Sequence, residues 1–143
     1  MSRYLKLAAA LAILVTVTTG CANHATASLS PGTDLSLLKT MYVKKIPADK
    51  QTNELIATKL RSKGVTVTTG EGPAPSDVDA LVTYFDKWRW DMTMYMLELT
   101  INIDDPKTGA HLATGNSLHA SLTRKSPPEM VDEVVENIYK SKK

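Results

Sequence analysis

Apolar and polar residues alternate most regularly between residues 80 and 104. This period of two is typical of β-strands, and residues 92–93 can form the tight turn of a hairpin. Because successive side chains of a strand point to opposite faces, the turn also fixes the register of the two strands. The predicted cross-strand pairs are Asp91 with Met94, Trp90 with Tyr95, Trp88 with Leu97 and Tyr84 with Ile101.

The two faces of this hairpin differ in composition. The inward face is apolar and aromatic, and it includes Trp88 and Trp90. These tryptophans could stack on sugar rings, although core packing accounts for them more simply. The opposite face carries charged and polar side chains together with Phe85, Met94 and Met96. Since the helices are needed on the inward face, these three residues are the candidates for a partner contact.

Asp86 interrupts the apolar inward face. In the predicted register it lies opposite Leu99, where an unpaired carboxylate would be costly to bury. We expect Asp86 to be paired with a lysine or with a donor at a helix end, to be bulged out, or to be protonated. A structural pair is favoured over a catalytic acid.

Further strands and a helix flank the hairpin. Alternating residues predict strands over 40–46 and 111–123, and a short β-branched strand over 65–68. Residues 49–63 predict an amphipathic helix, with Gly64 as its C-terminal cap.

The last helix has the clearest local signals. Ser126 is its N-cap, Pro127 takes the first helical position, and Glu129 completes a capping box. An apolar stripe then points to the core, while acidic residues point outward. The stripe consists of Met130, Val131, Val134, Val135 and Ile138, and the outward acids are Asp132, Glu133 and Glu136.

Together these elements predict a two-layer α+β sandwich. The expected order is strand, helix, three strands, helix, with a four-stranded sheet and both helices on one of its faces. The short strand at 65–68 is not counted among the four. Residues 35–143 are expected to form this one domain, without an internal repeat.

The chain offers few groups for catalysis. It has three histidines and one cysteine, and it lacks the nucleophile-elbow, zinc-protease and phosphate-loop motifs. His111 and His119 would lie about 26 Å apart on one strand, too far to share a metal. Ser117 and Ser121 flank His119, but a solvent-facing polar row explains them more simply than a nucleophile and its base. We expect no enzyme, no metal site and no cofactor.

The charge balance argues against a nucleic-acid partner. The chain has a formal net charge of +2, and both excess basic residues lie within residues 1–20. The remaining chain is neutral and has no basic stripe, so it lacks the electrostatic attraction that nucleic-acid binding requires.

The first 20 residues are organised like a secretory signal peptide. Two basic residues precede an apolar run over 7–17, which is too short to span a hydrocarbon layer of about 30 Å. Small residues follow, immediately before Cys21. This arrangement is similar to the signal of bacterial lipoproteins, in which the cysteine receives diacylglycerol on its sulfur and, after cleavage, an acyl chain such as palmitate on its amino group.

The predicted anchor places the domain on a membrane surface outside the cytoplasm. Residues 21–34 are small and polar, and we expect the lipidated cysteine followed by a flexible tether. Ala22 is not the aspartate that retains lipoproteins at the inner membrane, so the resemblance implies the outer membrane, facing the periplasm. The alternative is cleavage after Ala27, which would leave a soluble periplasmic or secreted protein.

Three short motifs mark residues 80–139. They are Tyr84-x-Asp86-x-Trp88-x-Trp90-Asp91, Asp105-x-x-Thr108-Gly109 and Ser121-x-x-Arg124-Lys125-x-Pro127. On these motifs the region resembles a family of small, largely uncharacterised proteobacterial outer-membrane lipoproteins. The predicted architecture also resembles that of the lipoprotein of the lipopolysaccharide translocon.

We therefore expect a non-enzymatic, lipid-anchored periplasmic protein that binds a protein or another envelope component as an assembly or accessory factor. A lipid- or glycan-binding protein with an aromatic cleft is the alternative, and a hydrolase comes third. A pocket beside Trp88 and Trp90 would favour the alternative. A continuous apolar face or an unpaired sheet edge would favour the assembly factor.

Overall fold

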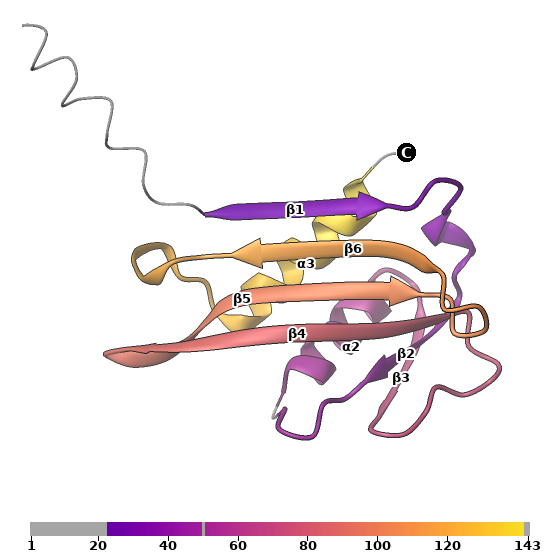
Figure 1. The fold of residues 1–143 in the computed structure, drawn as a ribbon, viewed down its shortest axis with the longest axis horizontal. Helices are drawn as coiled ribbons and strands as arrows, with labels where there is room; N and C mark the ends of the chain where they lie inside the picture. Colours follow the sequence, from indigo (N-terminus) through magenta and orange to yellow (C-terminus); the bar gives the residue numbers. More distant parts are fainter. Residues whose placement is uncertain (1–22, 50, 142–143) are drawn as a thin grey trace, which may run out of the picture.

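The computed structural model describes residues 23–49 and 51–141, which form one mixed sheet with two α-helices packed on one face (Figure 1). The sheet has six strands in the order β1-β6-β5-β4-β2-β3. The strands are β1 (His24–Leu29), β2 (Thr40–Lys44), β3 (Thr66–Gly70), β4 (Ala80–Asp91), β5 (Thr93–Asp104) and β6 (His111–Leu118). The α-helices are α2 (Thr52–Ser62) and α3 (Pro127–Lys140), and two short 3-10 helices are η1 (Leu35–Leu37) and η2 (Ser121–Thr123).

The expected four-stranded sheet is wrong, because two further segments join it. Residues 24–29, which the sequence pattern assigns to a flexible tether, form β1 and pair antiparallel with β6. The short β-branched segment becomes β3, which pairs parallel with β2. β1 shows little apolar alternation because its side chains are mostly exposed, and backbone pairing with β6 holds it instead. The two-layer α+β arrangement itself is observed.

The core lies between the sheet and the two helices. The predicted stripe of α3 is fully buried, and its capping box is present. Gly115 of β6 lets this helix approach the sheet closely, because a Cβ at that position would lie 2.8 Å from side-chain carbons of both Val134 and Ile138. None of the helices in the described part of the chain is long and apolar enough to cross a membrane.

The register of the β4–β5 hairpin changes partway along its length. From Leu81 to Lys87 the pairs follow the prediction, and Tyr84 pairs with Ile101. Beyond Lys87 the register shifts by one residue, which leaves Leu97 as the extra residue of a β-bulge. The turn is also one residue tighter than predicted, since Asp91 pairs with Thr93 around Met92. The two offsets cancel, so the prediction is right at the base of the hairpin and wrong by one residue at its end.

The bulge moves Met96 into the core. Met96 is completely buried and pairs with Trp88, so its predicted exposure on the outer face is wrong. A bulge exchanges the two faces of the strand beyond it, which turns Tyr95 to the outer side instead. There the guanidinium of Arg124 lies 4.9 Å from the centroid of the Tyr95 ring and covers it.

Candidate functional site

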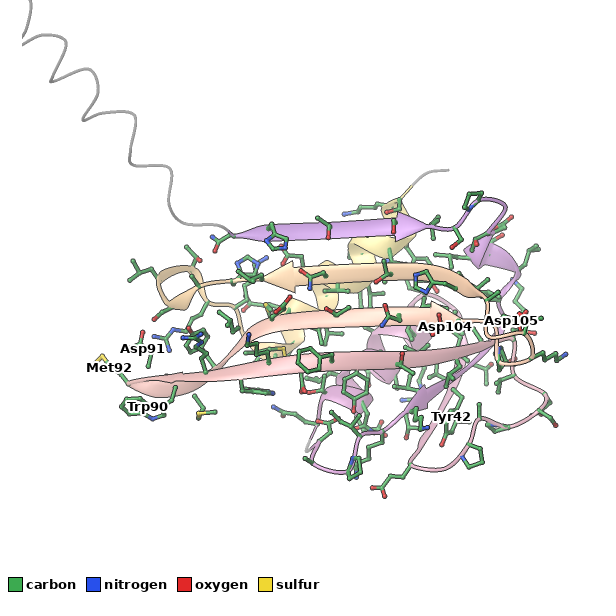
Figure 2. The ribbon with its side chains drawn as sticks, viewed as in Figure 1. Tyr42, Trp90, Asp91, Met92, Asp104 and Asp105 are labelled. Atoms are coloured by element: carbon green, nitrogen blue, oxygen red, sulfur yellow. The ribbon has the colours of Figure 1, made fainter. Side chains whose placement is uncertain are left out.

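The end of the hairpin extends beyond the helices. Figure 2 shows Trp90, Asp91 and Met92 at one extremity of the molecule. Trp90 is predicted to face the core, but 72% of its surface is exposed. The reason is that the end of the hairpin extends past both helices, so no helix covers the inward face of β4 at this point (Figure 1).

A cavity of about 690 Å³ lies where the hairpin leaves the core. One wall is formed by the β4–β5 hairpin and the other by the segment that leads from β2 into α2. The lining residues are the apolar Ile46, Ala48, Trp88 and Met94 and the polar Asp49, Gln51 and Asp86. Met94 is predicted on the outer face, yet after the bulge it lies on the same face as Met96 and Trp88, and it stays exposed.

Asp86 fixes the aromatic wall of this cavity. Its Oδ2 accepts hydrogen bonds from Thr52 Oγ1 at 2.8 Å and from the indole Nε1 of Trp88 at 3.1 Å. Thr52 is the first residue of α2 and is fully buried, so the expected pairing of Asp86 with a donor at a helix end is confirmed. The two bonds join β4 to α2 and hold the Trp88 ring in one orientation.

Asp49 closes the cavity at the start of α2. Its Oδ1 accepts from the backbone amides of Gln51 and Thr52, and its Oδ2 accepts from the amide of Asn53 at 2.7 Å and from Tyr84 Oη at 2.5 Å. Burial raises the pKa of Asp49, but these hydrogen bonds outweigh it and the net pKa is lowered. Burial and the bond to Asp49 raise the pKa of Tyr84. Asp49 is therefore an ionised helix cap with its oxygens already occupied, which is a structural role.

A second polar cluster lies between α3 and β6. Glu133, which the helix pattern places on the outer face, points to the sheet: its Oε2 accepts from Ser117 Oγ at 2.5 Å and lies 2.7 Å from His119 Nε2. Its Oε1 accepts from Lys125 Nζ at 2.7 Å. Ser117 and His119 are buried, so the predicted solvent-facing row is wrong. The alternation in β6 could have revealed this burial, because Ser117 lies on the same face of the strand as Ala113. Small residues on one face of a strand allow a helix to pack closely against it.

This cluster contains a serine, a histidine and a carboxylate, but not in the order of a hydrolase. Ser117 Oγ and His119 Nε2 both bond the same oxygen of Glu133, so the serine proton is directed to a carboxylate rather than to an imidazole. Burial raises the pKa of Glu133, but the bonds from Lys125, Ser117 and His119 lower it to about 2. The carboxylate stays ionised and ties α3 to β6. Within residues 23–49 and 51–141, no group of three or more acidic, histidine or cysteine side chains could hold a metal ion.

The outer face of the sheet is mainly polar. Asn116 Nδ2 donates to Glu98 Oε1 at 2.9 Å and to Thr100 Oγ1 at 2.8 Å, and Thr114 Oγ1 donates to Asn102 Oδ1 at 2.8 Å. Phe85, opposite Thr100, is exposed in these polar surroundings, as predicted. With Met96 buried and Met94 on the other face, the three predicted contact residues do not form one patch. Cys21 lies outside the described residues.

Comparison with known proteins shows the fold but no family. Neither a protein-family model nor a curated protein matches the sequence. Among solved structures, a single-residue variant of the PelC dodecamer from Paraburkholderia phytofirmans aligns with a TM-score of 0.59 and 16% identity over 81% of this chain and 96% of that chain. A PDZ domain protein from Parabacteroides distasonis aligns with a TM-score of 0.54 and 18% identity, over 96% of this chain and 40% of its own.

A minor lipoprotein from Acinetobacter baumannii aligns more weakly, with a TM-score of 0.38 and 11% identity over 70% of this chain and 87% of that chain. At identities this low, the likenesses above a TM-score of 0.5 concern the fold alone. The α+β arrangement of this chain is therefore one that solved bacterial proteins share. The resemblance to an uncharacterised lipoprotein family has no support from sequence comparison.

Proposed function

We propose that this chain is a non-enzymatic accessory protein of the bacterial envelope, held by a lipid on Cys21 at the outer membrane, and that it works by binding a ligand in the cavity beside Trp88. The cavity is the observation that carries this proposal. Its volume lies within the usual range for small-ligand sites, and it combines apolar walls with a few fixed polar groups. A pocket beside Trp88 and Trp90 is expected to favour a ligand-binding protein over an adaptor, and of these two tryptophans Trp88 lines the cavity.

The lining favours a glycan as the ligand. The indole N–H of Trp88 donates a hydrogen bond to Asp86, which fixes the orientation of the ring. The ring can therefore serve as a preoriented surface for stacking. Sugar rings stack their apolar C–H faces on such platforms, and their hydroxyl groups donate to neighbouring carboxylates. Asp86 lies on the cavity wall next to that ring. A cavity for an acyl chain alone would not place the carboxylate of Asp86 in its wall.

The carboxylates at this site also argue for binding rather than hydrolysis. Glycosidases need one carboxylic acid with a raised pKa beside a second carboxylate. Asp49 has a lowered pKa and caps α2, and Asp86 accepts two structural hydrogen bonds. Both bonds to Asp86 use Oδ2, so Oδ1 of Asp86 is the acceptor that this site offers a ligand, without the pair of acid and base that hydrolysis needs.

Titration of the purified protein with soluble peptidoglycan fragments and with lipopolysaccharide-derived oligosaccharides tests this function. We expect saturable binding by calorimetry, which Trp88→Ala weakens at least tenfold. Phe85→Ser is the matched control, because Phe85 lies on the same strand but faces the opposite side of the sheet. If Trp88→Ala keeps its fold and binds as well as wild type, or if both variants lose binding equally, the cavity is not the site.

A second candidate function is an assembly factor that acts by self-association. Two observations favour it: the sheet ends in the edge strands β1 and β3, and the solved PelC structures of similar fold are dodecamers. Sedimentation of the protein in mild detergent would reveal an oligomer of defined size. A monomer at all concentrations would remove this candidate while leaving the binding site untouched.

A further inference from the structure

We propose that the end of the molecule formed by the hairpin turn and η2 contacts the lipid bilayer, with Trp90, Met92 and Leu122 in the interfacial layer. We call these three side chains the apolar tip. The inference rests on the proposed lipid anchor at Cys21, and it adds an orientation: the domain stands with its hairpin end against the membrane, rather than hanging from a tether.

The position of the N-terminal residues carries this inference. Asn23 Oδ1 accepts hydrogen bonds from the backbone amide of Ala120 at 3.3 Å and from Thr123 Oγ1 at 2.6 Å. Asn23 is thereby attached to η2 and its flanking residue. Cys21 precedes Asn23 by two positions in the chain, and a fully extended chain gains at most about 3.5 Å per residue. The backbone of the lipidated residue is therefore held within roughly 7 Å of Asn23.

The topology of the sheet puts the hairpin turn at the same end. His24 pairs with Leu118, so β1 begins where β6 finishes, and Figure 1 shows both on the side of the molecule towards which β4 and β5 extend to their turn. η2 is also bonded to the turn itself: Ser121 Oγ donates to Asp91 Oδ2, and Arg124 Nη1 donates to Thr93 Oγ1 at 2.9 Å. The anchor, η2 and the turn thus form one end of the molecule.

Large apolar side chains gather at this end and have little protein around them. Trp90 is 72% exposed, Met92 85% and Leu122 91%. They come from two separate elements that the bonds just described bring together. Exposed apolar clusters of this kind are unfavourable in water, and they mark surfaces that something else covers.

The charges and the tryptophan at this end suit a bilayer. Tryptophan is enriched at the membrane interface, where its amphipathic ring lies at the level of the headgroups. Arg89 is exposed beside the tip and can pair with lipid phosphates. Asp91 is the acidic residue of the turn, and it accepts the hydrogen bond from Ser121. A protein partner would have to fit between this end and the membrane that the anchor holds next to it.

The backbone of the turn gives an independent reason. Met92 has a φ of 58°, in the left-handed region that a glycine or asparagine adopts at lower cost. The turn therefore keeps a large apolar residue in a strained conformation at a place where it contacts little of the protein. Insertion of the side chain into the interface accounts for its exposure and for the presence of methionine where glycine would cost less.

Fluorescence quenching in vesicles tests the orientation. The lipoprotein, purified from membranes, is reconstituted into vesicles of phosphatidylethanolamine and phosphatidylglycerol with brominated acyl chains. Trp88→Phe leaves Trp90 as the only tryptophan, and Trp90→Phe leaves Trp88. We expect emission from Trp90 to be quenched at least threefold more strongly than emission from Trp88. Met92→Asp combined with Leu122→Asp should reduce the quenching of Trp90 by half or more.

Coupling through Cys21 separates this proposal from the proposed anchor. Cys21 is the only cysteine, so the mature chain can be attached to a maleimide lipid in the same vesicles. If cellular protein carries no lipid but the coupled chain shows strong quenching of Trp90, the anchor proposal fails and the orientation holds. If the chain is attached and Trp90 is quenched no more than Trp88, the orientation is overturned. Crosslinking of an unquenched tip to a second copy would likewise overturn it, in favour of self-association.

Discussion

The base and the end of the β4–β5 hairpin use the same two strands but differ in what covers them. At the base, Tyr84, Leu99 and Ile101 are buried beneath the helices. At the end, Trp90 and Met94 lie on the same inward side but remain mostly exposed. In β4 the alternation of apolar and polar residues continues through Trp88, Arg89 and Trp90 to the end of the hairpin. An apolar face alone therefore does not make a core, because burial also requires a second layer above it.

The boundary between the two regions lies just beyond the bulge at Leu97, between the fully buried Met96 and the exposed Met94. At the base, the polar groups on the inward side are hydrogen-bonded, since Asp86 accepts bonds from Thr52 and Trp88. Thr52 is the first residue of α2, so the helical layer that covers the hairpin ends there. Beyond it, the same face forms a cavity and then a free end. We interpret the base as the part that stabilises the fold and the end as the part that meets ligands and lipid.

The largest expected change in stability comes from introducing a charge on the buried side of this boundary rather than on the exposed side. Met96→Glu places an unpaired carboxylate at a fully buried position, and we expect it to destabilise the domain by about 3–5 kcal/mol. Met94→Glu, two residues earlier on the same face, should change stability by less than about 0.5 kcal/mol, because Met94 is 59% exposed. Urea unfolding measures both. Equal destabilisation by the two variants would place the boundary elsewhere.

A smaller effect concerns Glu133, which holds α3 over the sheet. Glu133→Gln weakens bonds to the buried Ser117 and His119, and we expect a loss of about 1–3 kcal/mol at neutral pH. The pKa of Glu133 falls from 4.5 to about 2 on folding. The stabilisation is therefore complete above about pH 4.5 and disappears as the pH falls towards 2.

The stability difference between wild type and Glu133→Gln should accordingly shrink across that pH range. Asp77→Asn is the control, since Asp77 is an exposed acidic residue in the loop between β3 and β4. A difference that stays constant between about pH 5 and about pH 2.5 would show that the ionised carboxylate is not what holds the helix.

The smallest expected effect lies in the turn itself and has the opposite sign. Met92→Gly removes the cost of a left-handed backbone at a non-glycine residue, but glycine also gives the unfolded chain more conformational entropy. Because the first effect is the larger, we expect a net gain of about 0.5–1 kcal/mol in the free energy of unfolding. Thr93→Gly, at the neighbouring position where φ is not positive, should instead reduce stability. If Met92→Gly destabilises the domain, the apolar side chain stabilises the turn and the strain argument for the tip is wrong.

Local sequence patterns determined much of this fold. The capping box and apolar stripe of α3 are predicted correctly, because both depend on residues within a few positions of one another. The base of the hairpin is predicted for the same reason, down to the pairing of Tyr84 with Ile101. The alternation also predicts that Asp86 needs a hydrogen-bond donor, since it places this carboxylate on the apolar face of the strand.

Contacts between distant segments decided the rest. β1 has no strand pattern of its own and exists because β6, far away along the chain, offers it an edge. The bulge at Leu97 reversed the faces of Tyr95 and Met96, a change that a period of two cannot reveal. Only the packing of α3 on β6 brought Glu133 to Ser117 and His119. The sequence shows which side chains prefer burial, but the tertiary structure determines which of them find a covering layer.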